Sequence, residues 1–364
     1  MPRPLFEVKD LRIEVHDPNE AVRAARRGDA GEGWSVGIPG LSFAVAEGEV
    51  LGIVGESGAG KSLALLGAFG LLPAGTRAAG GTITFDGAVF RPAEVPSGRR
   101  RDGKRRAARR RMIAGTVAAD VDDEWARRVG LEVGFLFQNP IAAWNPLETI
   151  GPQAGEALDV HTDLDDAEIQ RRVVDALGDV QLPRSGRLLG AFRHQMSRGQ
   201  GQRAMLAAAL TKSPRLLIAD EPLSGLDPSV AAAILDLIRD LQRRRGMAMV
   251  MVTHDLGAIA RVADRVAVMY AGRIVEEGPA SRVFHQPQHP YTAGLLASVP
   301  GLDRRLVPIP GEAPRLGQIA RGCPFAPRCG FAEAACLRAE PVLEPIGYSK
   351  AACHRMFHLD LEGI

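Results

Sequence analysis

The chain has 364 residues, of which 46% are hydrophobic and 24% charged, an ordinary globular balance that can supply a core across two or three structural units. Its formal net charge of +2 is too close to zero to favour nucleic acid as a partner of the whole protein. No segment approaches 18 uninterrupted apolar residues, and the first residues contain no apolar stretch long enough for a secretory signal. We therefore expect a cytoplasmic protein that reaches a membrane only through partners.

The first third of the chain predicts strands around one glycine-rich turn. The expected strands are 8–15, 42–45, 49–54 and 81–87. The polar segment 17–33 between the first two is expected to be a surface excursion. A helix should follow the glycine turn over 61–72 and end at Pro73 and Gly75.

The middle of the chain predicts a helical subdomain beside buried parallel strands. An apolar strand is expected over 131–137, and the mostly polar sequence from about 139 to 200 favours helices. The short apolar runs 216–219 and 247–252 are typical of parallel strands buried on both faces.

A helix between these two runs carries its own start and stop signals. Asp227 can cap it, Pro228 suits its first turn and Gly246 can end it. Its apolar positions fall on one face, which predicts packing on a sheet. The segments 265–270 and 273–277 are expected to form a hairpin. Beyond Phe284 the sequence becomes rich in proline.

The strongest chemical motif is a phosphate-binding loop, which follows an apolar strand and opens a helix. It reads Gly55-Glu56-Ser57-Gly58-Ala59-Gly60-Lys61-Ser62. The glycines let backbone N–H groups point at phosphates, and the helix N-terminus adds partial positive charge. Lys61 suits the β and γ phosphates of ATP, and Ser62 offers a hydroxyl to Mg²⁺.

Two further groups of residues end predicted strands. Asp220 and Glu221 follow the run 216–219, so one carboxylate can lie near Mg²⁺ and the other can polarise water; we assign Asp220 to the metal and Glu221 to the general base. His254 ends the run 247–252, where it can sense the γ-phosphate and hold the attacking water. ATP hydrolysis is the predicted reaction.

With these motifs the sequence resembles the nucleotide-binding subunits of ABC transporters over about 5–355. Ser224-Gly225-Leu226-Asp227 is similar to their D-loop, and Phe137-Gln138-Asn139-Pro140 is similar to their Q-loop. The resemblance implies a phosphate-loop ATPase of the α/β class with a helical subdomain. It also implies that Gln138 contacts the metal and nucleotide, and that its loop senses a membrane partner.

The family signature, usually Leu-Ser-Gly-Gly-Gln, reads Met196-Ser197-Arg198-Gly199-Gln200 here. The resemblance implies that Ser197, Gly199, Gln200 and the D-loop Asp227 meet ATP held by the phosphate loop of a second subunit. Arg198 replaces a glycine that permits close backbone approach. It can weaken this capping, add positive charge beside the phosphate, or point harmlessly outward. A heterodimer with one robust and one compromised site is the resulting hypothesis.

The aromatic residue that stacks on adenine in this family is missing. Val15 stands where it is expected, and His16 and Trp34 are the nearby candidates.

Within the family the chain resembles the oligopeptide, dipeptide and nickel importers, through residues 137–146, 289–296 and the tail. All four cysteines, Cys323, Cys329, Cys336 and Cys353, lie in that tail with the spacing C-x5-C-x6-C-x16-C. Such clustering in a cytosolic chain favours a metal or cluster site over disulfides. The resemblance implies a [4Fe–4S] cluster; zinc and reduced thiols without metal remain alternatives.

An arginine-rich stretch over 99–111 looks like an insertion relative to the family. It can touch anionic lipid headgroups or RNA, and the plainer interpretation is a solvated loop balanced by the acidic residues of 120–124.

The predicted organisation is an ABC nucleotide-binding domain over 1–285 and a C-terminal extension over 286–364. The resemblance implies two permease subunits, a second ABC ATPase and, indirectly, an extracytoplasmic substrate-binding protein as partners at the cytoplasmic face of the cell membrane. No nucleic-acid partner is expected. The alternative function is a soluble ABC ATPase accessory to an enzyme complex, of the carbon–phosphorus lyase type, and the cysteine tail argues against it.

Overall fold

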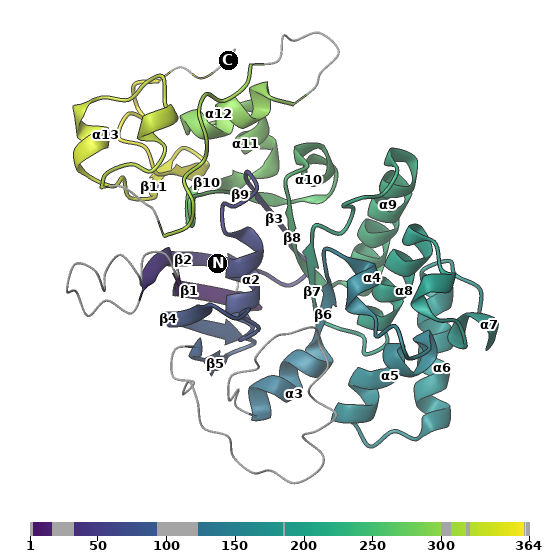
Figure 1. Cartoon of the computed structure of the whole chain (residues 1–364). Helices are drawn as coiled ribbons and strands as arrows, with labels where there is room; N and C mark the ends of the chain where they lie inside the picture. The colour runs from purple at the N-terminus through teal and green to yellow at the C-terminus, as the bar shows by residue number, and fades with distance from the viewer. Residues whose placement is uncertain are drawn as a thin grey trace.

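The computed structural model describes residues 3–16, 33–92, 123–184, 186–299, 307–317, 321–359 and 361. Two β-sheets with helices packed against them make up this part of the chain (Figure 1), so the predicted α/β class is confirmed. The predicted excursion at 17–32, the arginine-rich stretch 99–111 and residues 120–122 lie outside the described residues.

The smaller sheet is antiparallel and has the strand order β2-β1-β4-β5. Its strands are β1 (Phe6–His16), β2 (Trp34–Val45), β4 (Thr76–Phe85) and β5 (Ala88–Phe90). Each of the strands predicted at 8–15 and 42–45 lies within a longer strand, and the strand predicted at 81–87 overlaps the end of β4.

The larger sheet has the strand order β11-β12-β10-β9-β3-β8-β7-β6. Its strands are β3 (Val50–Val54), β6 (Val133–Leu136), β7 (Leu216–Asp220), β8 (Ala248–Thr253), β9 (Arg265–Tyr270), β10 (Arg273–Pro279), β11 (Glu344–Ile346) and β12 (Ser349–Ala351). From β9 to β6 all neighbours are parallel. The short apolar runs therefore form buried parallel strands, as predicted.

Successive side chains of the central strands enter two different cores. Leu51 and Ile53 of β3 pack with the smaller sheet, whereas Val50 and Val54 pack on the opposite face with the helices. Because strand side chains alternate between the two faces, a strand that is apolar throughout must be covered on both sides. The larger sheet is thus enclosed between the smaller sheet and a helical layer.

The helices beside the parallel strands are α2 (Lys61–Ala68), α9 (Pro228–Arg245), α10 (Leu256–Val262) and α11 (Ala280–His285). In α9, Gly246 adopts a left-handed conformation with φ 63° and ends the helix as predicted. Asp227 occupies the N-cap position, but its side chain makes no capping hydrogen bond. Its exposed carboxylate is therefore available for other contacts.

A second group of helices gathers at the β6 end of the larger sheet (Figure 1). It comprises α3 (Asp123–Glu132), α4 (Pro140–Ala143), α5 (Ile150–His161), α6 (Asp166–Asp179), α7 (Gly186–Leu189), the 3-10 turn η3 (Arg193–Gln195) and α8 (Arg198–Leu210). Most of these helices lie within the segment from about 139 to 200 that was predicted to be helical.

The C-terminal extension lies at the other end of the sheet, in green (α12) to yellow in Figure 1. It contains α12 (Pro290–Ala297), η4 (Ala326–Arg328) and α13 (Ala334–Arg338) as well as β11 and β12. Strand β12 pairs with β10, with Ala351 opposite Glu276, so the extension completes the larger sheet.

Two further element boundaries differ from the prediction. Helix α2 ends at Ala68 rather than near residue 72, because Gly70 takes a left-handed conformation and the Leu71 N–H bonds back to the Leu66 carbonyl. The strand expected over 131–137 begins only at Val133, since α3 continues to Glu132. Apolar periodicity alone does not separate the end of a helix from the start of a buried strand.

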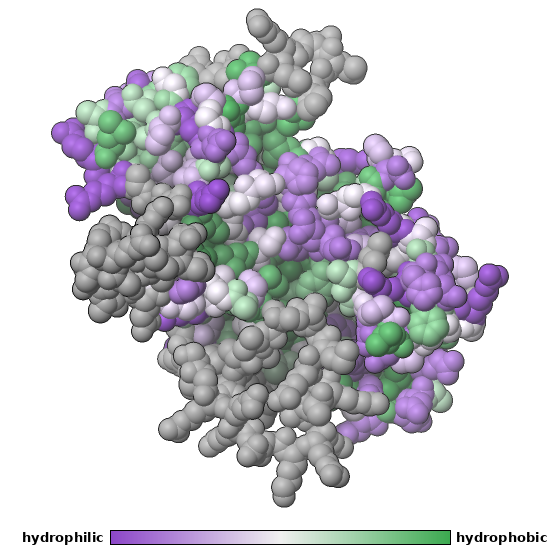
Figure 2. All heavy atoms as spheres, viewed as in Figure 1, coloured by the Kyte–Doolittle hydropathy of each residue, from purple (hydrophilic) through white to green (hydrophobic). Residues whose placement is uncertain are grey.

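No helix in the described part of the chain is both long enough and apolar enough to cross a membrane. Figure 2 shows mostly hydrophilic side chains on the visible face, with hydrophobic ones in the recess around the position of α2.

Candidate functional site

The predicted site residues meet at one edge of the larger sheet. Strands β3, β8, β7 and β6 are parallel neighbours, so their carboxyl ends lie side by side. The phosphate-binding loop follows β3, Asp220 ends β7, and Gln138 follows β6 by two residues. This edge is where open α/β sheets place their ligands.

Glycines shape the phosphate-binding loop. Gly55 has φ 156°, and a Cβ on it would lie 2.1 Å from the Met269 carbonyl oxygen, so only glycine fits there. Gly58 and Gly60 have φ 84° and 97°, in the left-handed region that favours glycine. Ser57, directly before Gly58, is exposed.

Lys61 is buried at the start of α2, with 7% of its surface exposed. Its Nζ donates to the carbonyl oxygens of Gly55 (2.7 Å) and Glu56 (3.0 Å), which holds the ammonium inside the loop. Burial lowers its pKa, while the charges of Glu221, Asp220 and Glu56 oppose that shift. The lysine is thus placed at the centre of the predicted nucleotide site.

Ser62 and Asp220 meet across the edge of the sheet. The Ser62 hydroxyl donates to Asp220 Oδ1 at 2.7 Å, and burial raises the pKa of Asp220. Hydroxyl and carboxylate oxygens are the ligands that Mg²⁺ prefers, so this pair fits the predicted metal assignment. Gln138 is exposed next to them in the sheet order.

Glu221 and His254 were each predicted as site residues, but the sequence did not predict that their side chains contact each other. His254 Nδ1 lies 2.8 Å from Glu221 Oε1, and the His254 N–H donates to the same oxygen at 3.1 Å. Thr253 donates its hydroxyl to Glu221 Oε2 at 3.1 Å. Thr253 was missed, although its position directly before His254 at a strand end was a usable signal.

Glu221 has an unusual backbone for a residue with a side chain, with φ 47°. Non-glycine residues rarely occupy the left-handed region, and strain of this kind persists where surrounding contacts hold it. The Glu221 N–H bonds to the Val252 carbonyl of β8 at 2.8 Å, which fixes the turn and aims the carboxylate along the edge.

The signature residues lie apart from this edge, at the N-terminus of α8. Ser197 caps α8 by accepting from the Gln200 N–H at 3.2 Å, and the Gln200 side chain accepts from the Ser197 N–H at 3.0 Å. Arg198 donates to the carbonyl of the D-loop residue Gly225 at 3.0 Å. Its side chain is exposed but tethered, and Gly199 packs near Val230.

Both aromatic candidates of the expected adenine region already make contacts within the chain. The guanidinium of Arg77 lies 4.3 Å from the centre of the Trp34 ring, and His16 packs edge-on against Trp34. Val15 is half-buried, and a Cβ on Gly317 of the C-terminal extension would lie 3.2 Å from it. The extension thus reaches the position of the missing aromatic.

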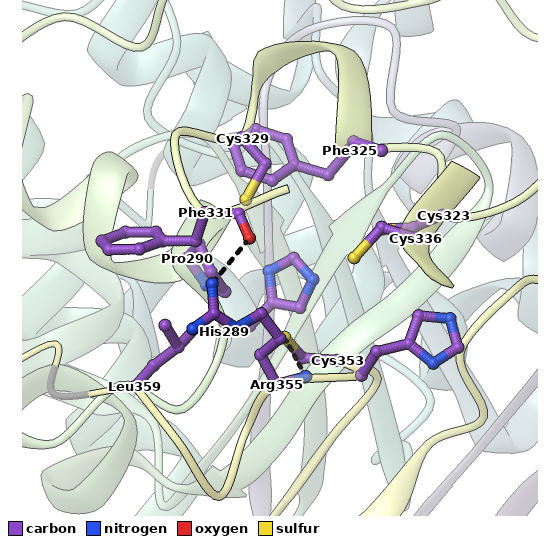
Figure 3. A pocket seen from close by; sticks show the side chains of 12 residues that line it. His289, Pro290, Cys323, Phe325, Cys329, Phe331, Cys336, Cys353, Arg355 and Leu359 are labelled. Carbon is purple, nitrogen blue, oxygen red and sulfur yellow. Dashed lines mark hydrogen bonds between the residues drawn. The ribbon is translucent and has the colours of Figure 1, made fainter. Parts of the chain in front are cut away.

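The four cysteines line one small cavity of about 20 Å³ (Figure 3). Backbone N–H groups two or three residues further on donate to the sulfurs of Cys323, Cys329 and Cys353, and burial raises the pKa of all three thiols. Cys336 is buried in α13. The residue types and the N–H···S bonds suit a thiolate-bound group.

A metal site is nevertheless not assembled in the structure. Within the described ranges, no three His, Cys, Asp or Glu side chains are placed so that they hold one metal ion. The expected cluster and its zinc alternative therefore find no direct support in the geometry.

Comparison with known proteins covers nearly the whole chain. The family described as "ABC transporter" matches residues 38–224, and "Oligopeptide/dipeptide transporter, C-terminal region" matches 275–336. A protein of Brucella ovis named as a peptide import ATP-binding protein is 41% identical over 325 residues, 85% of this chain and 88% of the relative. The oligopeptide transport ATP-binding protein OppD of Mycobacterium tuberculosis is 37% identical over 358 residues, 97% of this chain and 52% of the longer relative.

Two solved structures share the fold. The ATP-binding cassette MJ0796, in a dimeric structure bound to ADP and Pi, has a TM-score of 0.56 at 22% identity and covers 76% of this chain and 98% of its own. The protein cbiO1 from Clostridium perfringens has a TM-score of 0.56 at 24% identity and covers 78% and 91%. These likenesses confirm the predicted ABC ATPase fold.

Proposed function

The chain belongs to the ABC transporter family of ATP-binding proteins, and we propose that it is the ATP-hydrolysing subunit of an importer for peptides or similar small solutes. The observation that carries this proposal is the convergence of Lys61, the Ser62–Asp220 pair and the Glu221–His254 pair on one sheet edge. The names of the relatives support the peptide class, and the match to the oligopeptide/dipeptide C-terminal region agrees with it.

Each residue at the edge has a distinct role in hydrolysis. The loop amides and Lys61 bind the triphosphate, and Ser62, Asp220 and Gln138 would hold Mg²⁺, which neutralises the phosphate oxygens when bound. Glu221 takes a proton from the attacking water, and His254 orients Glu221 through Nδ1. Thr253 fixes the second carboxylate oxygen, so the base has one orientation.

In this proposal a second ATPase subunit completes the enclosure of ATP that is bound at the phosphate loop of the first. Ser197, Gly199, Gln200 and Asp227 lie on exposed or half-buried ends of α8 and α9, away from the phosphate loop of their own chain. They would contact nucleotide on a partner. Because Arg198 is tethered to Gly225, we propose that it alters the partner's site, so that the pair is a heterodimer with unequal sites.

The permease partners would dock near Gln138, at the cytoplasmic face of the membrane. The loop between α4 and α5 carries Leu147, whose side chain is 84% exposed. We infer that this exposed apolar side chain, which lies a few residues after the Q-loop, forms part of the permease contact. Motion of this loop would then connect the metal site to two permeases, which receive solute from an extracytoplasmic binding protein.

The test of the importer function is affinity purification of the tagged chain from gently solubilised membranes. We expect two multi-span permeases and a second ATPase. The Leu147→Ser variant should recover about tenfold less permease, because it loses about 1.5 kcal/mol or more of apolar burial. Val160→Ser removes another exposed side chain, on α5, and should recover normal amounts. Recovery of soluble enzymes alone would favour the accessory-ATPase alternative and overturn transport.

We further propose that Cys323, Cys329, Cys336 and Cys353 hold a [4Fe–4S] cluster. The proposal starts from the four thiols that line one cavity, and cluster binding would draw their sulfurs together and crosslink the tail. Anaerobically purified chain should contain about four iron and four sulfide per chain, and Cys336→Ser should lose most of both. Metal and acid-labile sulfide analysis checks this. One zinc per chain without sulfide, or no metal at all, would contradict the cluster.

The division into an ATPase domain over 1–285 and an extension over 286–364 also stays a proposal. The change in composition beyond Phe284 supports it, whereas the pairing of β10 with β12 ties the two parts together.

A further inference from the structure

The phosphate-binding loop is held from outside by the C-terminal extension. The Glu56 N–H donates to the hydroxyl of Tyr291 in α12 at 2.8 Å. The Glu56 carboxylate pairs with both terminal nitrogens of Arg328, at 2.7 and 3.0 Å. Arg328 lies 272 positions further along the chain, at the end of η4 and directly before Cys329.

Arg328 is fixed from several sides. It is 8% exposed, its Nε donates to the Pro310 carbonyl at 2.8 Å, and its Nη1 lies 3.4 Å from the Tyr270 hydroxyl. Tyr270 and Tyr291 pack against each other and against Phe325, which precedes η4. A guanidinium held at this many points presents a rigid, bidentate surface to a carboxylate.

Glu56 would oppose ATP binding if it were unpaired. It lies inside the loop that receives the triphosphate, and its own carbonyl accepts from Lys61 Nζ at 3.0 Å. Its charge is among those that act on Lys61. A carboxylate there repels phosphate, and partial burial, with 28% of the side chain exposed, limits screening by salt.

We infer that Arg328 is a positioning residue for ATP binding, which neutralises and orients Glu56 from the cysteine-bearing extension. The inference rests on the proposed binding of ATP at this loop. Leu316 of the extension also lies close to the loop, since a Cβ added to Gly60 would be 3.5 Å from its side chain. A change in the conformation of the extension would therefore be transmitted to the phosphate loop through these side chains.

The experiment is equilibrium titration of the full chain with a fluorescent ATP analogue. Arg328→Gln should raise the dissociation constant about tenfold, because the Glu56 charge is then unpaired. Adding Glu56→Gln should return affinity to within about threefold of the unmodified chain, since the repelling charge is gone. Rescue of this kind is not expected from a merely structural role.

The matched control is Glu340→Gln. It breaks the pair between Glu340 of the extension and Arg273 of β10, which also ties the extension to the sheet but touches no loop residue. Its ATP affinity should stay unchanged.

Unchanged affinity in Arg328→Gln, or a double variant as weak as the single one, would overturn the inference. If Arg328→Gln does not fold, Arg328→Met, which keeps an aliphatic stem and removes the charge, replaces it. A threefold loss that Glu56→Gln removes supports the inference, and unaltered affinity refutes it. Failure of the unmodified chain to bind the analogue would instead overturn the proposed ATP site itself.

Discussion

Replacement of Glu221 by glutamine is expected to slow ATP hydrolysis by about 100-fold or more. Glutamine keeps the size of the side chain but cannot take a proton from water. Its amide oxygen can still accept from the His254 N–H and its NH2 group can donate to the Thr253 hydroxyl oxygen, so the edge of the sheet should keep its shape. ATP binding should stay within about threefold of normal, because the phosphate loop is untouched. Measurement of steady-state hydrolysis together with nucleotide affinity checks both parts.

Asp236→Asn serves as the control for Glu221→Gln. This carboxylate is on α9, 64% exposed and paired with Arg261, so its loss should leave hydrolysis unchanged. Hydrolysis within tenfold of normal in Glu221→Gln would mean that another group is the base. A smaller defect in His254→Ala than in Glu221→Gln is expected, because His254 orients the base without replacing it.

The second large effect is on nucleotide binding. Lys61→Met should weaken ATP binding by about 10- to 100-fold, since a hydrogen bond to a charged group contributes about 1.5–3 kcal/mol. Methionine fills a similar volume in the buried site, so folding should persist. Equilibrium titration with ATP in the presence of Mg²⁺ is the measurement.

Lys212→Met is the matched control for Lys61→Met. Lys212 is a half-buried lysine, its Nζ donates to the Gly130 carbonyl at 2.6 Å, and desolvation lowers its pKa to about 8. It lies away from the phosphate loop, so its loss can cost stability but should not change ATP affinity. Equal losses of affinity in the two variants would show that Lys61→Met acts through stability rather than through phosphate contacts.

At the adenine site and the signature, sequence motifs did not predict which contacts the residues make. A motif gives a residue type at a position, but neighbours decide what it can contact. Trp34 is a possible stacking ring by position, yet Arg77 lies over its face. Arg198 had three possible roles, and its bond to Gly225 makes it part of the contact between signature and D-loop in one chain.

The sequence by itself determined the local parts of this protein. The phosphate loop, the strand that precedes it and the helix that follows are coded within a few residues, because glycine conformations and apolar runs act over short range. The acids after β7 and the histidine after β8 could be placed at one edge, since parallel strands align their carboxyl ends.

Only the tertiary structure decided which of these groups touch. The Glu221–His254 bond depends on β7 and β8 being neighbours, and the Glu56–Arg328 pair joins residues 272 positions apart. Likewise, β12 joins β10 through backbone hydrogen bonds, which carry no residue signature. Contacts across such separations follow from strand order and from the packing of whole elements, and short-range patterns in a single sequence do not encode them.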